Sequence, residues 1–202
     1  MITLYGTSMS RAGRCLWALE ELGLQYEHKP ISFTGETRKP EYLKINPNGH
    51  IPALDDNGLI VWESMAINLY LGEKYGKSPL WPSSVQEHAH TYQWSFWGMT
   101  EVEPLLMAIF LNRMMLPEAQ RSEQAAKNAE AALKAPLKVL DEHLNGREYL
   151  LGKDFTVADL NVASVMLLIG FMKLDISGFP RAAAWFNRCA GRPANQRAGS
   201  KK

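Results

Sequence analysis

The first third of the chain alternates short β-prone runs with stretches of helical periodicity. Residues 2–5 predict a first strand, and residues 26–31 predict a second. Between them, residues 11–22 carry apolar side chains at helical spacing and stop at Gly23, which is typical of a helix with a glycine C-cap. A strand, a helix and a second strand in this order predict a parallel pair joined by a right-handed crossover.

The following segment adds antiparallel strands and two helices. Pro40 favours the start of a short helix that reaches residue 45. Asn57-Gly58 is a strong hairpin signal between β-prone residues 53–55 and 59–62. Ser64 then opens an apolar-periodic helix that ends at Gly76. The predicted order is therefore β-α-β-α-β-β-α, a small mixed sheet covered by helices.

Beyond residue 77 the strand signal disappears. Residues 78–84 have the composition of a linker, so we expect one domain over residues 1–77 and an all-helical domain over residues 85–202. The expected helices of the second domain cover residues 85–115, 117–146, 160–168 and 180–190. The helix from Pro117 carries one apolar stripe but contains Pro136, which predicts a kink or two helices. Thr156 to Asp159 form a capping-box variant ahead of a helix that is apolar nearly all round and is therefore expected to be buried.

Bulk composition excludes several functional classes. The chain has 202 residues, of which 46% are hydrophobic and 21% charged, and a net charge of +1, which argues against nucleic acid or an anionic membrane as a partner. The basic residues from Arg192 onward are interpreted as a solvated end. The two cysteines have no metal-type spacing, so no metal site is expected, and their small number fits a reducing cytoplasm. No membrane span or signal peptide is expected either.

The most specific chemistry lies in residues 46–54, read Asn-Pro-Asn-Gly-His-Ile-Pro-Ala-Leu, and in Glu63-Ser64 nine residues later. Pro52 stands at the entrance of a short strand, and Ser64 stands at the start of a helix. A strand edge and a positively polarised helix N-terminus side by side can hold a small peptide with a free carboxylate. We therefore expect a peptide-binding site here.

Four segments together resemble the cytosolic glutathione S-transferase family, in its bacterial, serine-type form. They are residues 46–54, residues 63–71, the Gly-Lys-Asp-Phe-Thr-Val-Ala-Asp run at 152–159, and the Arg-Pro-Ala-Asn-Gln-Arg-Ala run at 192–198. The resemblance covers nearly the whole chain. It implies an N-terminal thioredoxin-like domain followed by a C-terminal helical bundle, a cytoplasmic homodimer, and a detoxifying transferase that uses glutathione as a co-substrate and needs no cofactor.

The resemblance also assigns residues to glutathione. Ser64 and the free N–H groups of its helix would hold the γ-glutamyl carboxylate, and Glu63 would lie beside the γ-glutamyl ammonium group. A cis bond between Ile51 and Pro52 would turn the Ile51 backbone outward to pair with the cysteinyl backbone of the tripeptide. His50 precedes that bond and either contacts the ligand or is an exposed loop side chain.

A basic residue is expected opposite the glycine carboxylate of glutathione. Arg38 and, as the alternative, Lys39 lie in the loop before the short helix, where surface charges without a ligand are equally common.

Three hydroxyls are candidates for the group that activates the thiol. The family places a Tyr, Ser or Cys near the end of the first strand, and a hydroxyl donor there favours the thiolate over the thiol. Ser10 is the first choice, although it is also a good helix cap, and Ser8 and Tyr5 are the alternatives. Cys15 lies inside the first helix, where a packed, inert thiol is expected.

A small apolar electrophile is the expected second substrate. Trp94, Trp97 and Met107, at the start of the helical domain, are candidates for its pocket, although such residues at helical spacing more often form core. Two other functions stay open. The fold also serves as a non-catalytic binding or regulatory module, and a glutathione-dependent isomerase branch carries a Ser-Ser-Cys loop that residues 8–11 do not match.

Overall fold

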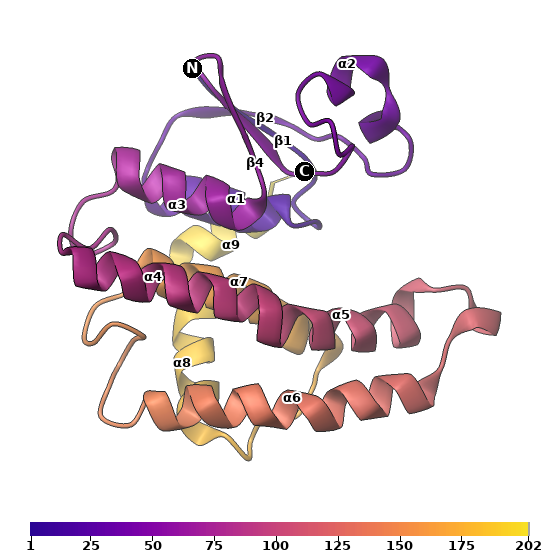
Figure 1. The fold of residues 1–202 in the computed structure, drawn as a ribbon, viewed down its shortest axis with the longest axis vertical. Helices are drawn as coiled ribbons and strands as arrows, with labels where there is room; N and C mark the ends of the chain where they lie inside the picture. Colours follow the sequence, from indigo (N-terminus) through magenta and orange to yellow (C-terminus); the bar gives the residue numbers. More distant parts are fainter. Residues whose placement is uncertain (202) are drawn as a thin grey trace. The chain divides into compact units, whose positions relative to one another are not determined.

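The computed structural model describes residues 1–201, which form two compact units (Figure 1). The first unit holds residues 1–81 together with the chain from Gly191 onward, and the second unit holds residues 82–190. Within the described residues no helix has the length and apolarity that crossing a bilayer requires.

The first unit is built on a four-stranded mixed sheet with the strand order β2-β1-β3-β4. Its strands are β1 (Ile2–Tyr5), β2 (Tyr26–Lys29), β3 (Ala53–Asp56) and β4 (Leu59–Trp62). β1 is parallel to β2, and β3 is antiparallel to β4, as the sequence predicts; β1 also pairs antiparallel with β3. The hairpin turns at Asn57 and Gly58, whose φ angles of 54° and 94° are those that a two-residue hairpin loop demands.

Helices α1 (Ala12–Glu21) and α3 (Ser64–Tyr75) pack side by side against one face of the sheet (Figure 1). Their inward side chains and those of the central strands form the core, in which Leu4, Trp17 and Ile67 are fully buried. A short 3₁₀ turn, η1 (Glu36–Arg38), and α2 (Pro40–Leu43) fill the connection from β2 to β3.

The last helix, α9 (Pro193–Gly199), packs on α1 (Figure 1). The sequence interpretation placed residues 191–201 in the helical domain and treated the basic residues there as a solvated end. The structure differs because these cations are paired: Arg192 binds Glu21 at 2.6 Å, and Arg197 binds Glu20 at 2.8 Å. The packing of this segment therefore belongs to the first unit.

The second unit is all helical. Its elements are α4 (Val85–Trp97), η2 (Gly98–Val102), α5 (Glu103–Phe110), η3 (Leu111–Met115), η4 (Glu118–Gln120), α6 (Glu123–His143), α7 (Val157–Met172) and α8 (Pro180–Ala190), of which η2 and η3 are π-helical. α7 is the central helix and packs against α4, α5 and α8. The capping box at its start is confirmed, since both the N–H and the hydroxyl of Thr156 donate to the Asp159 carboxylate at 2.9 Å.

Two predictions for the second unit are wrong in detail. The helix expected from Pro117 begins at Glu123, because Ser122 supplies the N-cap and accepts the Ala125 N–H at 3.2 Å. Of the two alternatives for Pro136, the division into two helices is wrong, since α6 continues through it to His143. The apolar stripe is confirmed: its leucines at 133, 137, 140 and 144 are all buried.

Candidate functional site

Strand register brings three segments to one edge of the sheet. Tyr5 at the end of β1 lies opposite Ala53 at the start of β3, and Ala53 lies opposite Trp62 at the end of β4. The loop after β1, the loop before β3 and the start of α3 therefore meet at this edge. The approach is close: a Cβ atom at Gly6 would lie 2.8 Å from the Ala12 Cβ and 3.0 Å from the Ile51 Cβ, so glycine is required there.

The loop before β3 is held in place by two hydrogen bonds to the backbone carbonyl of His50. The Tyr42 hydroxyl donates to this oxygen at 2.7 Å, and the Asn46 amide donates to it at 2.8 Å. The same Asn46 side chain accepts the N–H of Asn48 at 3.1 Å, closing the turn that precedes His50. Both Tyr42 and Asn46 are buried, so the backbone ahead of Ile51 is fixed in place.

The peptide bond between Ile51 and Pro52 is cis, as predicted. Pro52 is buried, and Ile51 is partly exposed. No hydrogen bond joins the Ile51 N–H or C=O to another residue in the described part of the chain. These two groups are therefore open to an added strand or an extended ligand.

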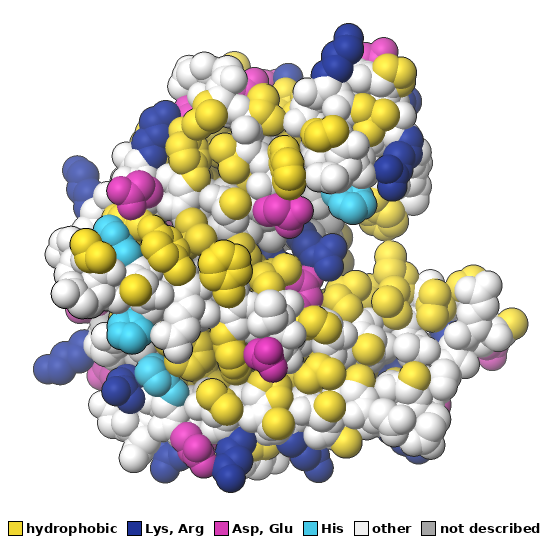
Figure 2. Space-filling view, in the orientation of Figure 1, with side chains coloured by type: hydrophobic (Ala, Val, Ile, Leu, Met, Phe, Trp, Pro, Cys, Tyr) yellow, Lys and Arg dark blue, Asp and Glu magenta, His cyan; other side chains and the backbone are white. Residues whose placement is uncertain are grey.

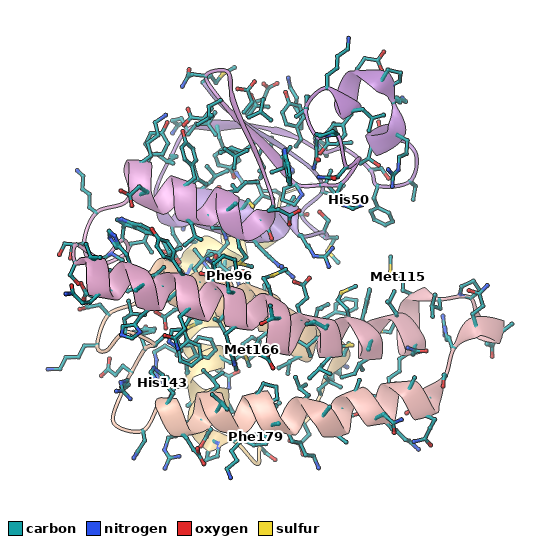
Figure 3. All side chains as sticks on the ribbon, viewed as in Figure 1. His50, Phe96, Met115, His143, Met166 and Phe179 are labelled. Atoms are coloured by element: carbon teal, nitrogen blue, oxygen red, sulfur yellow. The ribbon has the colours of Figure 1, made fainter. Side chains whose placement is uncertain are left out.

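The basic candidates lie beside this loop. The Arg38 guanidinium donates to the Asn48 carbonyl at 3.1 Å and remains exposed. Lys39 is the exposed N-cap residue of α2. His50 is exposed on the loop that follows α2 (Figure 3), so its imidazole is available to a ligand while its carbonyl holds the loop.

The start of α3 combines a buried hydroxyl with a strained backbone. Ser64 is 2% exposed, and the Arg14 Nη1 atom lies 3.5 Å from its Oγ. The helix N-cap is Glu63, one residue earlier than the sequence suggested, so Ser64 occupies the first helical turn. Glu63 has a φ of 73° and an exposed side chain. Such a conformation costs about 1–3 kcal/mol in a residue with a Cβ and is found most often at ligand sites.

Arg14 adds positive charge beneath the helix terminus. It is a buried residue of α1, and its guanidinium points at the first turn of α3. The N-terminal end of a helix carries a partial positive charge of its own. The two together favour an anion next to Ser64.

Cys15 is packed and unreactive, as expected. Its thiol is fully buried and lies 3.6 Å from the Ser64 carbonyl. Burial raises the pKa of Cys15 far above its usual value, and the nearby Arg14 guanidinium lowers it only in part. The thiolate form that nucleophilic chemistry requires is therefore strongly disfavoured.

All three candidate hydroxyls lie on or beside the loop after β1, but both serines are engaged. The Ser10 hydroxyl donates to the Thr7 carbonyl at 2.7 Å and accepts the N–H of Ala12, the first residue of α1, at 3.1 Å. The Ser8 hydroxyl donates to the Lys201 carbonyl at 2.7 Å. The Tyr5 ring packs edge-on against Tyr42 with 6.2 Å between centroids.

The pocket candidates of the second unit differ in exposure. Trp94 is only 6% exposed; its ring meets that of Trp97 edge-on and that of His143 at a tilt, with centroid distances of 5.0 and 4.6 Å. It is therefore a core residue, which is the common fate of an aromatic side chain at helical spacing. Trp97 and Met107 are partly exposed and keep a surface that could meet a ligand.

From the sequence, no role was assigned to the side chains of Tyr42, Asn46 or Arg14. Asn46 could have been found, because Asn-Pro-Asn-Gly is a turn signal in which an asparagine side chain bonds backbone two residues on. The roles of Tyr42 and Arg14 depend on tertiary contacts that no local pattern reveals. Residues 1–201 contain no cluster of three His, Cys, Asp or Glu side chains arranged to hold a metal.

Comparisons with known proteins agree with this architecture. The family model described as "Glutathione S-transferase, N-terminal domain" matches residues 1–73, and the one described as "Glutathione S-transferase, C-terminal domain" matches residues 102–193. Glutathione S-transferase D7 of Drosophila melanogaster is 32% identical over 188 residues, which is 91% of this chain and 82% of the relative. Glutathione S-transferase GstB of Escherichia coli is 30% identical over 198 residues, which is 96% of this chain and 95% of the relative.

A solved structure extends the likeness to three dimensions. The theta class glutathione S-transferase from Xanthomonas axonopodis pv. citri, determined with glutathione bound, has a TM-score of 0.88 and 28% identity, and the match covers 100% of this chain and 98% of that one. Sequence, domain order and fold agree over the full length of the chain. The protein belongs to the glutathione S-transferase family.

Proposed function

We propose that the edge of the sheet described above binds glutathione and that the protein transfers the tripeptide to an apolar electrophile. The observation that carries this proposal is the meeting of two features at that edge, the open backbone groups of Ile51 and the N-terminal turn of α3. They offer strand-like pairing for a peptide and a positive end for its carboxylate.

The groups at this edge of the sheet define the direction in which glutathione binds. Its γ-glutamyl carboxylate accepts hydrogen bonds from Ser64 and the first N–H groups of α3, where Arg14 supplies further positive charge. Glu63, whose side chain is exposed, receives the γ-glutamyl ammonium group. The cysteinyl backbone pairs with Ile51, and the glycine carboxylate meets Arg38, with Lys39 and His50 nearby in the chain.

Ser10 is the proposed activating hydroxyl. Its proton now points to Thr7, and turning it to the glutathione sulfur retains the Ala12 N–H as a donor to the same oxygen. A hydroxyl that accepts one hydrogen bond is polarised toward donating another. Donation to the sulfur lowers the thiol pKa and raises the fraction of thiolate, which attacks the electrophile. With an aromatic chloride, the sulfur bonds to the ring carbon and chloride leaves with the bonding electron pair.

Trp97 and Met107 are the proposed contacts for the apolar electrophile. Both keep exposed apolar surface within the second unit, whereas Trp94 does not. Thioethers adapt to many shapes, which suits a site that accepts several electrophiles in cytoplasmic detoxification.

We also propose that the protein forms a homodimer whose interface is an apolar stripe on α4. Val85, Ala89, Tyr92 and Phe96 recur at helical spacing on one exposed face, and Figure 2 shows hydrophobic side chains gathered along this helix. Exposed contiguous apolar surface of this kind marks protein interfaces. Phe96→Glu is expected to shift the light-scattering mass from a dimer to a monomer, and an unchanged dimer would contradict the assignment.

One observation favours a second candidate, a glutathione-binding module without turnover. The protons of Ser8 and Ser10 are both committed to protein carbonyls, so neither hydroxyl is free without rearrangement. Such a protein would bind glutathione and leave its thiol pKa unchanged.

Calorimetry with glutathione and conjugation of an aromatic chloride distinguish these functions. We expect binding, a bound thiol with a lowered pKa, and measurable conjugation. Ser10→Ala is expected to keep glutathione affinity and to lose conjugation by about 100-fold, the scale of a positioned proton donor. Binding without conjugation would establish the module, and no binding at all would overturn the proposed site.

A further inference from the structure

The loop that carries Ser10 is fastened to the last described residues of the chain. The hydroxyl of Ser8, two positions before Ser10, donates to the carbonyl of Lys201 at 2.7 Å. The two residues are far apart in the sequence, so this bond closes the chain on itself within the first unit.

The Lys201 carbonyl is itself held by ion pairs to α1. Arg197 and Lys201 bind the Glu20 carboxylate at 2.8 and 3.2 Å, and Arg192 binds Glu21 with two hydrogen bonds at 2.6 and 2.9 Å. Glu21 also accepts the indole N–H of the buried Trp17 at 2.9 Å, which fixes the carboxylate. α9 is thus attached along α1, the helix that begins two residues after Ser10.

The other end of the same loop has little room to shift. A Cβ atom at Gly13 would lie 2.3 Å from the Ser8 carbonyl, so the turn of residues 7–10 rests directly on the first turn of α1. Within that turn the Ser10 N–H donates to the Thr7 carbonyl at 3.0 Å. A displacement of Ser8 therefore also displaces Ser10, because the turn between them is short and tightly packed.

We infer that α9 and Lys201 form a positioning clasp that, through Ser8, sets the placement of Ser10 beside the glutathione sulfur. The inference rests on the proposed function and deepens it, because it makes Ser8 a positioning residue and not the thiol donor. Lys201 contributes its backbone carbonyl, and the three basic side chains contribute the attachment to α1.

Three variants separate this role from simple stabilisation. Ser8→Ala removes the donor, and a chain ending at Ser200 removes the acceptor. Lys201→Ala is an intermediate variant, since it keeps the carbonyl and removes only one of the three basic side chains that attach α9 to α1. One neutral hydrogen bond corresponds to about a fivefold effect, so we expect the first two variants to lower kcat about fivefold and to raise the pKa of bound glutathione. Combining the first two variants should add nothing further. Lys201→Ala should have a smaller effect than either of them, because the carbonyl and two of the three attachments remain; an effect as large as that of the shortened chain would contradict the role of the carbonyl.

A readout that needs no glutathione accompanies these measurements. Amide hydrogen exchange in residues 7–14 should speed up in Ser8→Ala and in the shortened chain, while the rest of the first unit keeps its protection. Unchanged exchange and an unchanged thiol pKa in both variants would overturn the clasp even if the protein binds and conjugates glutathione. Loss of all conjugation in Ser8→Ala with full activity in the shortened chain would also overturn it, because Ser8 would then be the thiol donor.

Discussion

The loop of residues 46–52 and the loop of residues 6–10 meet at the same sheet edge but are prepared for a ligand in opposite ways. In the first, buried side chains bind the His50 carbonyl and leave the Ile51 backbone open. In the second, the serine hydroxyls already donate to protein carbonyls. In the proposed function, recognition of the peptide is therefore built in before binding, whereas activation of the thiol requires a hydroxyl to change its partner.

The largest effect on glutathione binding is expected at Ser64, where a buried hydroxyl, the N-terminal end of α3 and Arg14 lie together. Ser64→Ala removes a hydrogen bond to the ligand carboxylate worth about 2 kcal/mol and should weaken glutathione binding by about 30-fold in calorimetry. Ser122→Ala is the matched control, since it removes a serine cap from α6 and should cost about 1 kcal/mol of stability with no change in affinity. Equal affinities in the two variants would show that Ser64 does not touch the ligand.

Glu63 is expected to lower the stability of the fold and to raise the affinity for glutathione. Glu63→Gly relieves the positive φ and should raise the free energy of unfolding by about 1 kcal/mol, while glutathione affinity falls. Glu63→Gln keeps the backbone constraint and loses only the charge, so it should weaken binding without the gain in stability. Denaturant melts and calorimetry on both variants test this; a Glu63→Gly protein that binds as well as the unaltered chain would refute the role of the carboxylate.

Substitution of Tyr42 is expected to have a smaller effect, confined to the loop of residues 46–52. Tyr42→Phe removes one of two donors to the His50 carbonyl and should raise KM for glutathione about fivefold with kcat unchanged. A fall in kcat at constant KM would mean that the two loops are coupled, against the comparison drawn above.

The pH dependence of stability gives an independent check on Tyr42. Burial, and to a smaller extent Tyr5, raises the pKa of Tyr42 from 10.0 to about 12. The phenol is neutral in both states below pH 10, so its contribution to stability is complete there. Between pH 10 and about 12 the unfolded chain loses the proton first, so this contribution declines as pH rises. Tyr42→Phe should flatten that part of the stability curve.

The smallest effect is expected at Cys15. Cys15→Ala should leave conjugation and the pKa of bound glutathione unchanged, and the thiol of the folded protein should resist iodoacetamide. Rapid alkylation of Cys15 in the folded state would show that the first helix opens near the site.

Local signals predicted individual turns and caps well. The hairpin at Asn57-Gly58 and the capping box at Thr156 each act through neighbours in the sequence, and the structure confirms both. The cis bond before Pro52, which the structure also contains, was expected from the family resemblance and not from a local pattern. The contacts of Arg14 and Tyr42 depend on how α1 and α2 pack, and the bond between Ser8 and Lys201 depends on where α9 lies. Such contacts have no periodicity, so they became visible only in the folded chain.

The place of α9 has a consequence for how the protein is made. Because α9 packs on α1 although the whole helical unit is synthesised between them, the second unit is an insertion within the first. A ribosome releases residues 1–81 long before the partner of α1 emerges. The sheet and its two covering helices must therefore persist incomplete during synthesis, with the α1 surface that later receives α9 exposed to solvent or to a chaperone.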